Sequence, residues 1–373
     1  MEVWFSWLCL VSDEQNSIVR FYTIFIYMSS FLSTLQQYIQ LLEPHFLSFQ
    51  DTLPSFGDDP YRRLIIDALS QNGKKLRPAL ALISAQAYGY ESDIHIFTAL
   101  EAFHKFILMH DDIIDDDLMR RWKPTLRNAA QELYCGAGSR KHFGTSLAII
   151  GGDLGHNITM DIILQSPLSA TTKVVALQEL SRAMESVSRW RYQQFLTDDQ
   201  TIDEVDIQTI IQYNMIQVTG KYSFTFPLRF GKAVATGDGD IGAEMEELCD
   251  CLWVLFQTGD DRIWLFGDPS TTGKSNYGDI IQGKKTIPLY YGYLYATDAE
   301  KLLLKQLIGK KYLNEAEAHT VRSILSQRGG WATQAFIDSY VVKCHDLLKK
   351  VSLPIDLHVF LEGFVEYLVT RDK

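Results

Sequence analysis

The chain has 373 residues, of which 46% are hydrophobic and 22% are charged, so its composition is that of a globular protein and excludes a disordered or collagen-like one. Its 35 Lys and Arg against 46 Asp and Glu give a net charge of −11, which argues against a nucleic-acid partner.

The N-terminal 27 residues form a segment distinct from the rest. Residues 1–11 are apolar, but they include Glu2, have no basic start and are too short to span a bilayer. An amphipathic run from Phe31 to Phe49 follows Met28. We therefore expect a folded domain over residues 28–373 and a dispensable extension or mis-called start over residues 1–27. A peripheral membrane anchor is the alternative for this extension.

Beyond residue 30 the pattern is helical throughout. Apolar residues recur at spacings of three and four, and alternating strand patterns are scarce. Short Gly, Pro, Asp and Ser breaks separate these runs, among them residues 71–73, 135–139, 198–206, 267–278 and 328–330. Without a long linker or a repeat, the pattern predicts one all-α domain with no integral membrane span, and a split into two domains is the alternative.

The five cysteines indicate a reducing compartment. They are odd in number and no two have CxxC spacing. We expect the cysteines to serve as small buried hydrophobic residues with reduced thiols. Reduced thiols are typical of a reducing compartment, so we expect a cytoplasmic protein.

The first chemical signal is a run of five aspartates in seven residues, 111–117. The apolar run before it, residues 98–108, is compatible with a helix, so Asp111 and Asp115 would share one face at the helix's C-terminal end. Carboxylates repel one another there and oppose the helix dipole. Oxygen-only ligands indicate a hard cation such as Mg²⁺, and a solvated acidic face is the alternative.

A second cluster, Asp260 and Asp261, also follows an apolar run, residues 248–256. Lysines in a glycine-punctuated stretch come next, at Lys274 and at Lys284. Such lysines beside acids suit a diphosphate that is held by metal on one side and by ammonium groups on the other.

Together, in this order, the motifs resemble those of the trans-type isoprenyl diphosphate synthases, the polyprenyl synthetase family. The resemblance covers residues 28–373. It rests on three motifs: Gly73-Lys74-x-x-Arg77, then Asp111-Asp112-x-x-Asp115 with Arg120-Arg121, then Gln257-x-x-Asp260-Asp261 with its lysine-bearing tail.

The resemblance implies a large helical bundle around a deep cavity, the isoprenoid synthase fold, with the two Asp motifs facing each other across its mouth. It also implies about three Mg²⁺ ions, a homodimer, and condensation of isopentenyl diphosphate with allylic diphosphates. Asp111, Asp115 and Asp260 would bind metal, supported by Asp112 and Asp261. Arg120, Lys274 and Lys284 would hold the allylic diphosphate. Isopentenyl diphosphate would be held by Lys74, Arg77, His104 and Arg121. Gln194, Thr219 and Gln257 match further family positions near the substrates.

The sequence departs from the family at three places, one of which is Thr197, where an Asp is common after Gln194. Trp264 stands where the second motif usually has a fifth-position Asp, and Val218 stands where a Lys is usual. We expect little loss from Trp264, because the first Asp of that motif is the expected metal ligand. Loss of a lysine contact would cost about 1.5–3 kcal/mol if Lys221, one turn away, does not replace it.

Product length depends on the volume beneath the first Asp motif. Ile107, Phe106 and Phe103 would lie roughly 6, 7.5 and 12 Å below Asp111 along the helix, where a growing tail descends. In the family, an aromatic five positions before the first Asp accompanies C20 products, so we predict geranylgeranyl diphosphate. Farnesyl diphosphate is the next candidate, and ordinary core packing is the alternative role of both phenylalanines.

Two other function classes stay open. One is a non-catalytic regulatory subunit of a heteromeric synthase, and Val218 and Trp264 favour it. The other is a terpene cyclase of related fold, which uses a first Asp motif but no second diphosphate. Arg121 and the Gly73–Arg77 stretch argue against a cyclase.

Overall fold

The computed structural model describes residues 31–46, 59–71, 73–198, 200–267, 278–310 and 312–370. Within these ranges helices predominate and the only strands are a two-residue pair, which confirms the all-α prediction. The extension 1–27 and Lys274 lie outside the described residues, as does the side chain of Val218.

The described part of the chain runs through a long succession of helices, interrupted once by the short strand pair. From the N-terminal side these elements are a helix over residues 31–46, α4 (Pro60–Ser70), α5 (Leu76–Ala87), the 3-10 turn η2 (Ile94–Phe97), α6 (Thr98–Ile114), β1 (Met119–Arg120), β2 (Lys123–Pro124), α7 (Leu126–Ala130), the 3-10 turn η3 (Gln131–Leu133), α8 (Arg140–Gln165), α9 (Ala170–Asp198), α10 (Ile207–Thr209), the π-helix η4 (Ile210–Thr225), α11 (Phe226–Thr236), α12 (Ala243–Phe266), α14 (Gly278–Gln282), α15 (Ile287–Leu294), α16 (Asp298–Leu307), α17 (Glu315–Leu348) and α18 (Ile355–Thr370).

Contacts gather the chain into two compact units. The α6 unit comprises Leu35–Ser181 and Pro227–Asp240, and the α12 unit comprises Arg182–Phe226, Ile241–Lys373 and the described part of Met1–Thr34. Because the segments of the two units alternate along the sequence, no single cut in the chain separates them. A single domain over residues 28–373 stays a prediction.

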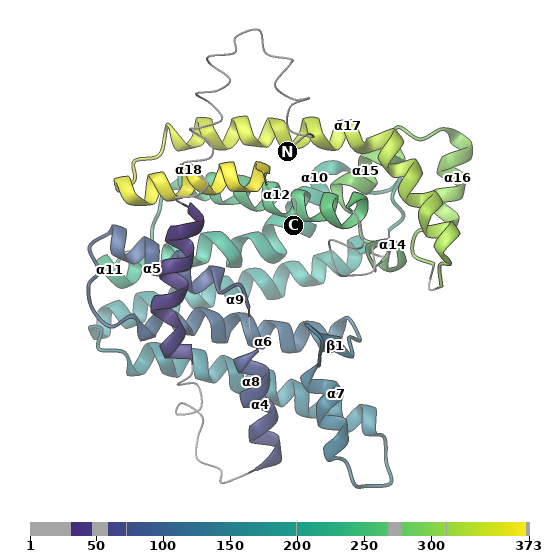
Figure 1. Cartoon of the computed structure of the whole chain (residues 1–373). Helices are drawn as coiled ribbons and strands as arrows, with labels where there is room; N and C mark the ends of the chain where they lie inside the picture. The colour runs from purple at the N-terminus through teal and green to yellow at the C-terminus, as the bar shows by residue number, and fades with distance from the viewer. Residues whose placement is uncertain are drawn as a thin grey trace. The chain divides into compact units, whose positions relative to one another are not determined.

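In the α6 unit, α6 and α8 lie side by side (Figure 1) because α8 presents glycines to its neighbour. A Cβ at Gly155 would lie 2.8 Å from the Cβ of Phe106, and one at Gly152 would lie 2.1 Å from Nε2 of His110. Any larger residue would therefore push the two helices apart. Phe103, Phe106 and Ile107 are all buried on α6, as expected of both the proposed floor and its core alternative.

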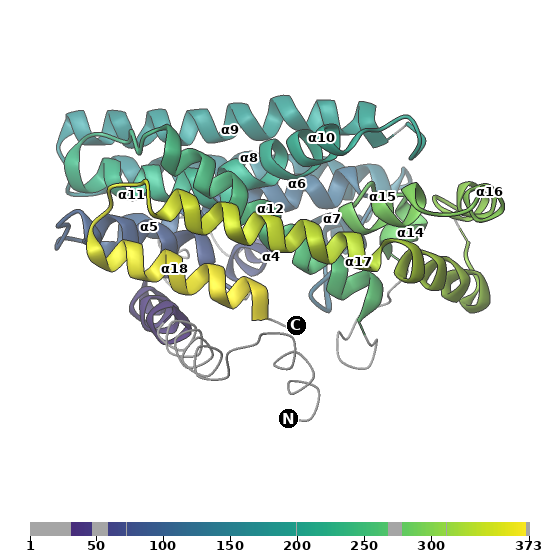
Figure 2. The same ribbon diagram turned by 90° about the horizontal axis from the view of Figure 1, so that it is seen from above.

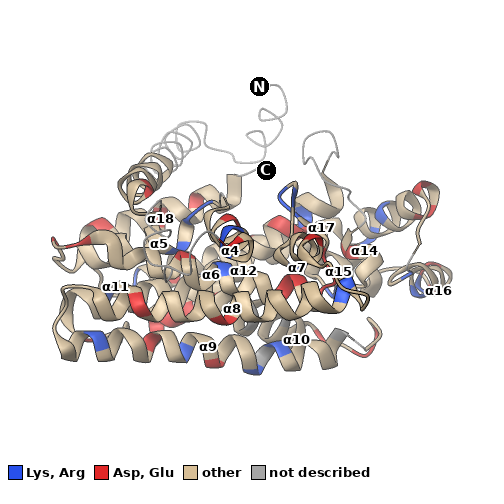
Figure 3. Ribbon diagram, turned by 90° about the horizontal axis from the view of Figure 1, so that it is seen from below, with Lys and Arg blue, Asp and Glu red and all other residues tan. Residues whose placement is uncertain are grey.

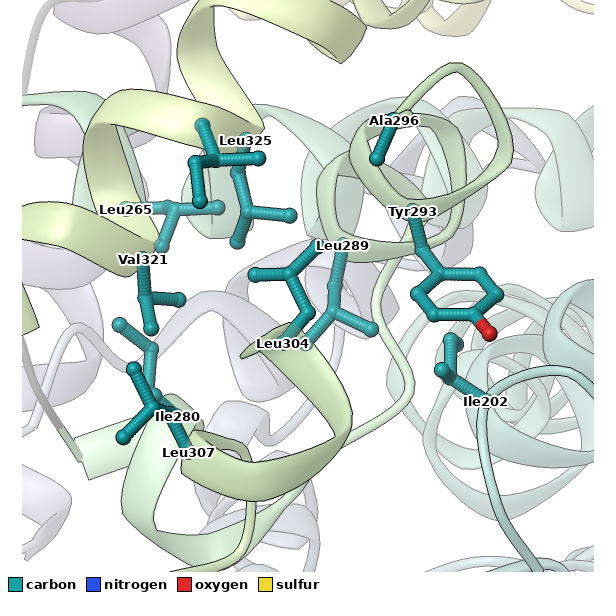
Figure 4. Packing of buried hydrophobic residues seen from close by; sticks show 11 residues of the cluster. Ile202, Leu265, Ile280, Leu289, Tyr293, Ala296, Leu304, Leu307, Val321 and Leu325 are labelled. Carbon is teal, nitrogen blue, oxygen red and sulfur yellow. The ribbon is translucent and has the colours of Figure 1, made fainter. Parts of the chain in front are cut away.

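In the α12 unit, α17 packs along α12 and α15 (Figure 2). Leu265, Ile280 and Leu289 join a buried cluster with Leu304 and Leu325 (Figure 4). This apolar cluster fixes the end of α12 and the following α14 against α15, and so it fixes the polar residues that these helices carry.

The break expected at residues 328–330 is wrong, because α17 runs through it from Glu315 to Leu348. A Cβ at Gly329 would lie 2.3 Å from the backbone nitrogen of Gly292 on α15. The glycine therefore serves close helix packing, and tertiary contacts outweigh its low helix propensity of about 1 kcal/mol relative to alanine.

Among the described residues, one helix, α8, is long and apolar enough to cross a membrane. It packs against α6 and α7, and 44% of its most apolar window is buried within the protein. Acidic and basic residues alternate along α9, which therefore carries no stripe of one sign (Figure 3).

Candidate active site

The first aspartate cluster lies where sequence analysis expects it, at the C-terminal end of α6. The helix ends at Ile114, Asp115 is its C-cap residue, and the backbone N–H of Asp115 donates to the carbonyl of Asp111 at 2.8 Å. Asp111 is half-buried and Asp115 is exposed. Their four-residue spacing places both side chains on one face of the helix, as predicted.

Asp112 points to another side of the helix end and is buried. Its Oδ1 accepts a hydrogen bond from Nε of Arg120 at 2.5 Å. Burial raises the pKa of Asp112 to about 6, although the Arg120 guanidinium acts to lower it. Arg120, predicted to bind the allylic diphosphate, is thus fixed by a neighbour of the predicted metal ligands.

A tight hairpin carries the two arginines. Met119 pairs with Pro124 and Arg120 with Lys123, so the two residues between the strands form the turn. These residues, Arg121 and Trp122, have φ values of 50° and 67°. Two-residue hairpin turns demand positive φ, which bulky side chains adopt only at a cost of about 1–3 kcal/mol each. Such strain commonly marks a functional site, and here the turn presents Arg121.

Three of the four residues predicted to hold isopentenyl diphosphate come together in the α6 unit. The pKa of His104 lies well below its usual value, because burial disfavours the imidazolium and because Arg77, Lys105, Arg121 and Arg120 all add positive potential. Lys74 is exposed on the loop that precedes α5. The cluster is therefore cationic and partly buried, which suits a diphosphate.

Gly73 lies directly against this cluster. A Cβ there would lie 2.9 Å from Nη1 of Arg121 and 3.2 Å from Oε1 of Glu101. A side chain at this position would displace the ends of the Arg121 and Glu101 side chains, so glycine lets the loop approach the Arg121 guanidinium closely. The Gly73-Lys74 motif thus has a packing reason as well as a chemical one.

The second cluster lies on α12. Asp260 is half-buried and Asp261 is buried, and Nε2 of Gln257 donates to Oδ1 of Asp261 at 2.7 Å. Burial raises the pKa of Asp261 to about 8, and the charges of Asp279 and Asp260 add to the rise while Lys284 opposes it. Crowded carboxylates of this kind favour a nearby cation.

A pocket of about 350 Å³ within the α12 unit opens over this cluster. It is lined by Gln257, Asp260, Asp261, Trp264, Asp279 and Lys284, among others. Nζ of Lys284 lies 3.4 Å from Oδ1 of Asp279. Asp279 is not among the site residues that the sequence predicts. The sequence feature that could have identified Asp279 is the Gly278-Asp279 pair, which lies five residues before Lys284.

Arg322 of α17 supports the end of the helix that carries this cluster. Its guanidinium donates to the carbonyls of Leu265 and Gly267 at 2.7 and 2.9 Å. The last carbonyls of a helix have no partner within it, so this side chain stabilises the C-terminal end of α12.

The remaining predicted residues have varied surroundings. Oε1 of Gln194 accepts a hydrogen bond from Nη1 of Arg191 at 2.9 Å, and Thr219 is half-buried on η4. Lys221 lies 2.8 Å from Oδ1 of Asp250, which is ten residues, or about 15 Å along α12, before Asp260. Lys221 is thus engaged in an ion pair with Asp250, away from the pocket.

The donor set suits a hard cation. Within the ranges that the structure describes, no three His, Cys, Asp or Glu side chains form a ready-made metal site. Mg²⁺ commonly uses only one or two carboxylates and completes its shell with water and phosphate oxygens. The paired Asp111 and Asp115, and Asp260 in its acidic pocket, provide that kind of ligand.

Comparison with known proteins agrees with these features. Residues 59–325 match the family model for polyprenyl synthetases. The chain is 27% identical to the geranylfarnesyl diphosphate synthase of Aeropyrum pernix over 89% of its own length and 100% of that protein. It is 26% identical to the geranylgeranyl diphosphate synthase of Sulfolobus acidocaldarius, covering 82% of this chain and 88% of that one. A farnesyl diphosphate synthase of Mycobacterium tuberculosis is 24% identical over 91% of the chain and 89% of its own length.

Solved structures share the fold. A geranylgeranyl pyrophosphate synthase from Corynebacterium glutamicum, complexed with isoprenyl diphosphate and magnesium, superposes with a TM-score of 0.71 at 20% identity. The match covers 92% of this chain and 98% of that one. A polyprenyl synthase from Caulobacter crescentus, complexed with calcium and isoprenyl diphosphate, gives a TM-score of 0.70 at 21% identity, covering 91% and 98%.

Proposed function

The chain belongs to the polyprenyl synthetase family and has its isoprenoid synthase fold, and from that premise we propose that it is a magnesium-dependent geranylgeranyl diphosphate synthase. Members of this family are prenyl diphosphate synthases, so the protein is a prenyl-transferring enzyme. The metal, the two substrates, the residue roles and the product length are parts of the proposal.

One observation supports the proposed reaction: α6 carries paired carboxylates at its end and has cations around His104. Paired carboxylates at its end, Asp111 and Asp115, suit a diphosphate bound through metal. The cations around His104, seven residues earlier and about 10 Å along the helix, suit a diphosphate bound without metal. A condensing enzyme needs both sites, whereas a cyclase needs only the first.

In this proposal the allylic diphosphate loses its carbon–oxygen bond, and the double bond of isopentenyl diphosphate attacks the resulting carbocation. A proton then passes to the departing diphosphate. Arg120, Lys274 and Lys284 stabilise the negative charge that develops on that leaving group. Mg²⁺ held by Asp111, Asp115 and Asp260 would add Lewis-acid neutralisation of the same charge.

The second substrate is held by Lys74, Arg77, His104 and Arg121. The lowered pKa of His104 keeps its imidazole neutral near pH 7, where it can still donate one hydrogen bond to a phosphate oxygen. The permanent charge in this site comes from the arginines, which bind phosphate in a fixed planar geometry.

The C20 product is proposed from the residue types of Phe106 and Ile107, five and four positions before Asp111, and their burial fits this role and ordinary core packing alike. Relatives named for farnesyl, geranylgeranyl and geranylfarnesyl products have similar identities, so family membership leaves the length open. A farnesyl product is the next candidate. Trp264 in the pocket favours one other function, that of a regulatory subunit.

We also propose a cytoplasmic homodimer. The dimer follows from the family resemblance alone. The cytoplasmic location is supported by the free thiols of Cys135, Cys249, Cys251 and Cys344, which suit a reducing compartment.

The test is an assay of the purified protein with Mg²⁺, isopentenyl diphosphate and each of the C5, C10 and C15 allylic diphosphates. Elongation to C20 that EDTA stops and Mg²⁺ restores is the expected result. Elongation that ends at C15 would replace the product assignment. Cyclised product would identify a cyclase, and no product from the protein alone would favour the regulatory subunit.

A further inference from the structure

Two side chains of α6 form a buried ion pair on the part of the helix that carries His104. Nζ of Lys105 lies 3.4 Å from Oε1 of Glu101, and the side chains are only 4% and 5% exposed. Neither residue has a role in the proposed reaction. Because burying two charges is costly, a pair at this depth calls for further partners.

Lys105 has such a partner in the loop between α4 and α5. Its ammonium donates to the main-chain carbonyl of Gln71, the residue that follows α4. Gly73 and Lys74, which belong to the predicted isopentenyl diphosphate site, come two and three residues later. Lys105 therefore fixes the base of this loop to α6.

Glu101 also lies close to Arg121 of the hairpin turn. Its Oε1 and Nη1 of Arg121 both lie against Gly73, 3.2 and 2.9 Å from where a Cβ would stand. Burial lowers the pKa of Arg121, and the charge of Glu101 opposes this effect. The carboxylate thus lies between two cations, Lys105 and Arg121.

The pair therefore joins three separate segments: the α4–α5 loop, α6 and the hairpin turn. Each segment carries at least one residue that is predicted to bind isopentenyl diphosphate. The turn is strained at Arg121, where φ is 50°, so it needs an external contact to hold this conformation. The charge of the buried Glu101 nearby favours the position of the Arg121 guanidinium.

We propose that Glu101 and Lys105 are positioning residues that set the affinity of the isopentenyl diphosphate site, Glu101 by holding Arg121 and Lys105 by holding the loop that bears Lys74. This inference rests on the proposed function. It concerns one substrate only, because the pair touches none of the aspartates predicted to act on the allylic diphosphate.

The test uses three variants of the full-length protein: Lys105→Met, Glu101→Gln and the double variant. We expect each single change to raise KM for isopentenyl diphosphate about tenfold, the loss that one charge-assisted hydrogen bond commonly causes. The KM for the allylic substrate and kcat should each change less than about twofold. The double variant should be no worse than the poorer single one, because residues that act as a unit are not additive.

The matched control is another buried ion pair of the α6 unit. Nε of Arg229 donates to Oε2 of Glu179 at 2.6 Å, and Glu179 is 2% exposed. Arg229→Met should lower the melting temperature and leave both KM values unchanged. If Lys105→Met behaves in the same way, the pair is merely structural and the inference is wrong.

If Lys105→Met does not fold, Glu101→Gln decides alone, because glutamine keeps the shape of glutamate and loses only the charge. An unchanged KM for isopentenyl diphosphate in that folded variant would overturn the inference. Failure of the proposed function is distinguishable, since the wild-type protein itself would then fail to elongate any allylic diphosphate.

Discussion

Asp112 accepts a hydrogen bond from Nε of Arg120 at 2.5 Å, and this contact connects the end of α6 to the hairpin that follows it. The aspartate is buried, whereas Arg120 keeps about a quarter of its side chain exposed. The buried carboxylate therefore orients a guanidinium whose other face is open. The second Asp of the first cluster thus has a different task from its neighbours Asp111 and Asp115.

Asp112→Asn should weaken binding of the allylic diphosphate. Loss of a charged hydrogen bond costs about 1.5–3 kcal/mol, so KM for this substrate should rise about tenfold or more. Steady-state kinetics with varied allylic diphosphate measures the effect. Asp117→Asn is the matched control, because its exposed carboxylate lies 3.8 Å from Nη2 of Arg120 and such pairs contribute about 0–1 kcal/mol. Equal effects of the two variants would contradict the role given to Asp112.

Asp111→Asn and Asp115→Asn should each lower kcat on the order of a thousandfold, because several kcal/mol of metal stabilisation would be lost. Neither should lower the melting temperature, since like charges at a helix C-terminus are already unfavourable. The control is Asp203→Asn, which removes a surface carboxylate 2.7 Å from Nζ of Lys305. A variant of Asp111 or Asp115 that keeps near-normal turnover would refute the metal assignment.

The sequence predicts the frame of the site well because helix periodicity and breaks are local signals. The end of α6 at Asp111 and Asp115 and the end of α12 near Asp260 follow from apolar runs that stop at acidic residues. Gln257 also lies where its i, i+4 spacing to Asp261 allows the observed hydrogen bond.

Features that depend on tertiary contacts escape sequence analysis. The hairpin turn at Arg121 and Trp122 lacks the Asn-Gly signal that such turns usually carry. Residues 98–108 read as an apolar run, yet they contain the buried pair Glu101 and Lys105, whose partners come from distant segments. Lys221 also forms an ion pair with Asp250, and no local sequence pattern predicts this contact.

Phe106→Ala should lengthen the product beyond C20. The ring packs against Phe103 at 5.1 Å and against His156 at 5.3 Å between centroids, so truncation opens space beneath the first Asp motif. The product distribution, separated by reversed-phase chromatography after dephosphorylation, measures the change. The variant should also lose about 3–5 kcal/mol of stability, so assays belong well below its melting temperature.

Phe230→Ala is the matched control for this prediction. Phe230 is fully buried on α11 in the same unit, so its truncation should cost similar stability and leave the product unchanged. If Phe106→Ala also leaves the product at C20, Phe106 is an ordinary core residue.

Stability should fall in mild acid because of His104. Burial and the nearby cations Arg77, Lys105, Arg121 and Arg120 lower its pKa well below the usual value. The unfolded chain, with a histidine pKa of about 6.5, therefore binds a proton that the folded protein does not bind. This group therefore does not reduce the free energy of unfolding above about pH 7, and it lowers that free energy as the pH falls through 6.5.

His104→Gln should reduce this loss. Urea unfolding at pH 7.5 and at pH 5.5, without substrate, gives the change in free energy of unfolding for each protein. His95 and His156 also have lowered pKa values, so the wild type and the variant must be compared with each other. The same pH dependence in both proteins would show that His104 is not the group responsible.

Asp279→Asn should raise the Mg²⁺ concentration needed for half-maximal activity. Asp279 lines the α12 pocket and its charge helps to raise the pKa of Asp261. Removing it makes the pocket less negative and should weaken attraction for a divalent cation about fivefold, which corresponds to about 1 kcal/mol. Asp356→Asn, an exposed position on α18, is the control and should leave the Mg²⁺ response unchanged. Trp264 provides no carboxylate to this pocket. The response to Mg²⁺ should therefore depend more strongly on Asp279 than on any other acidic residue outside the two aspartate clusters. An unaltered response to Mg²⁺ in Asp279→Asn would contradict the role given to Asp279.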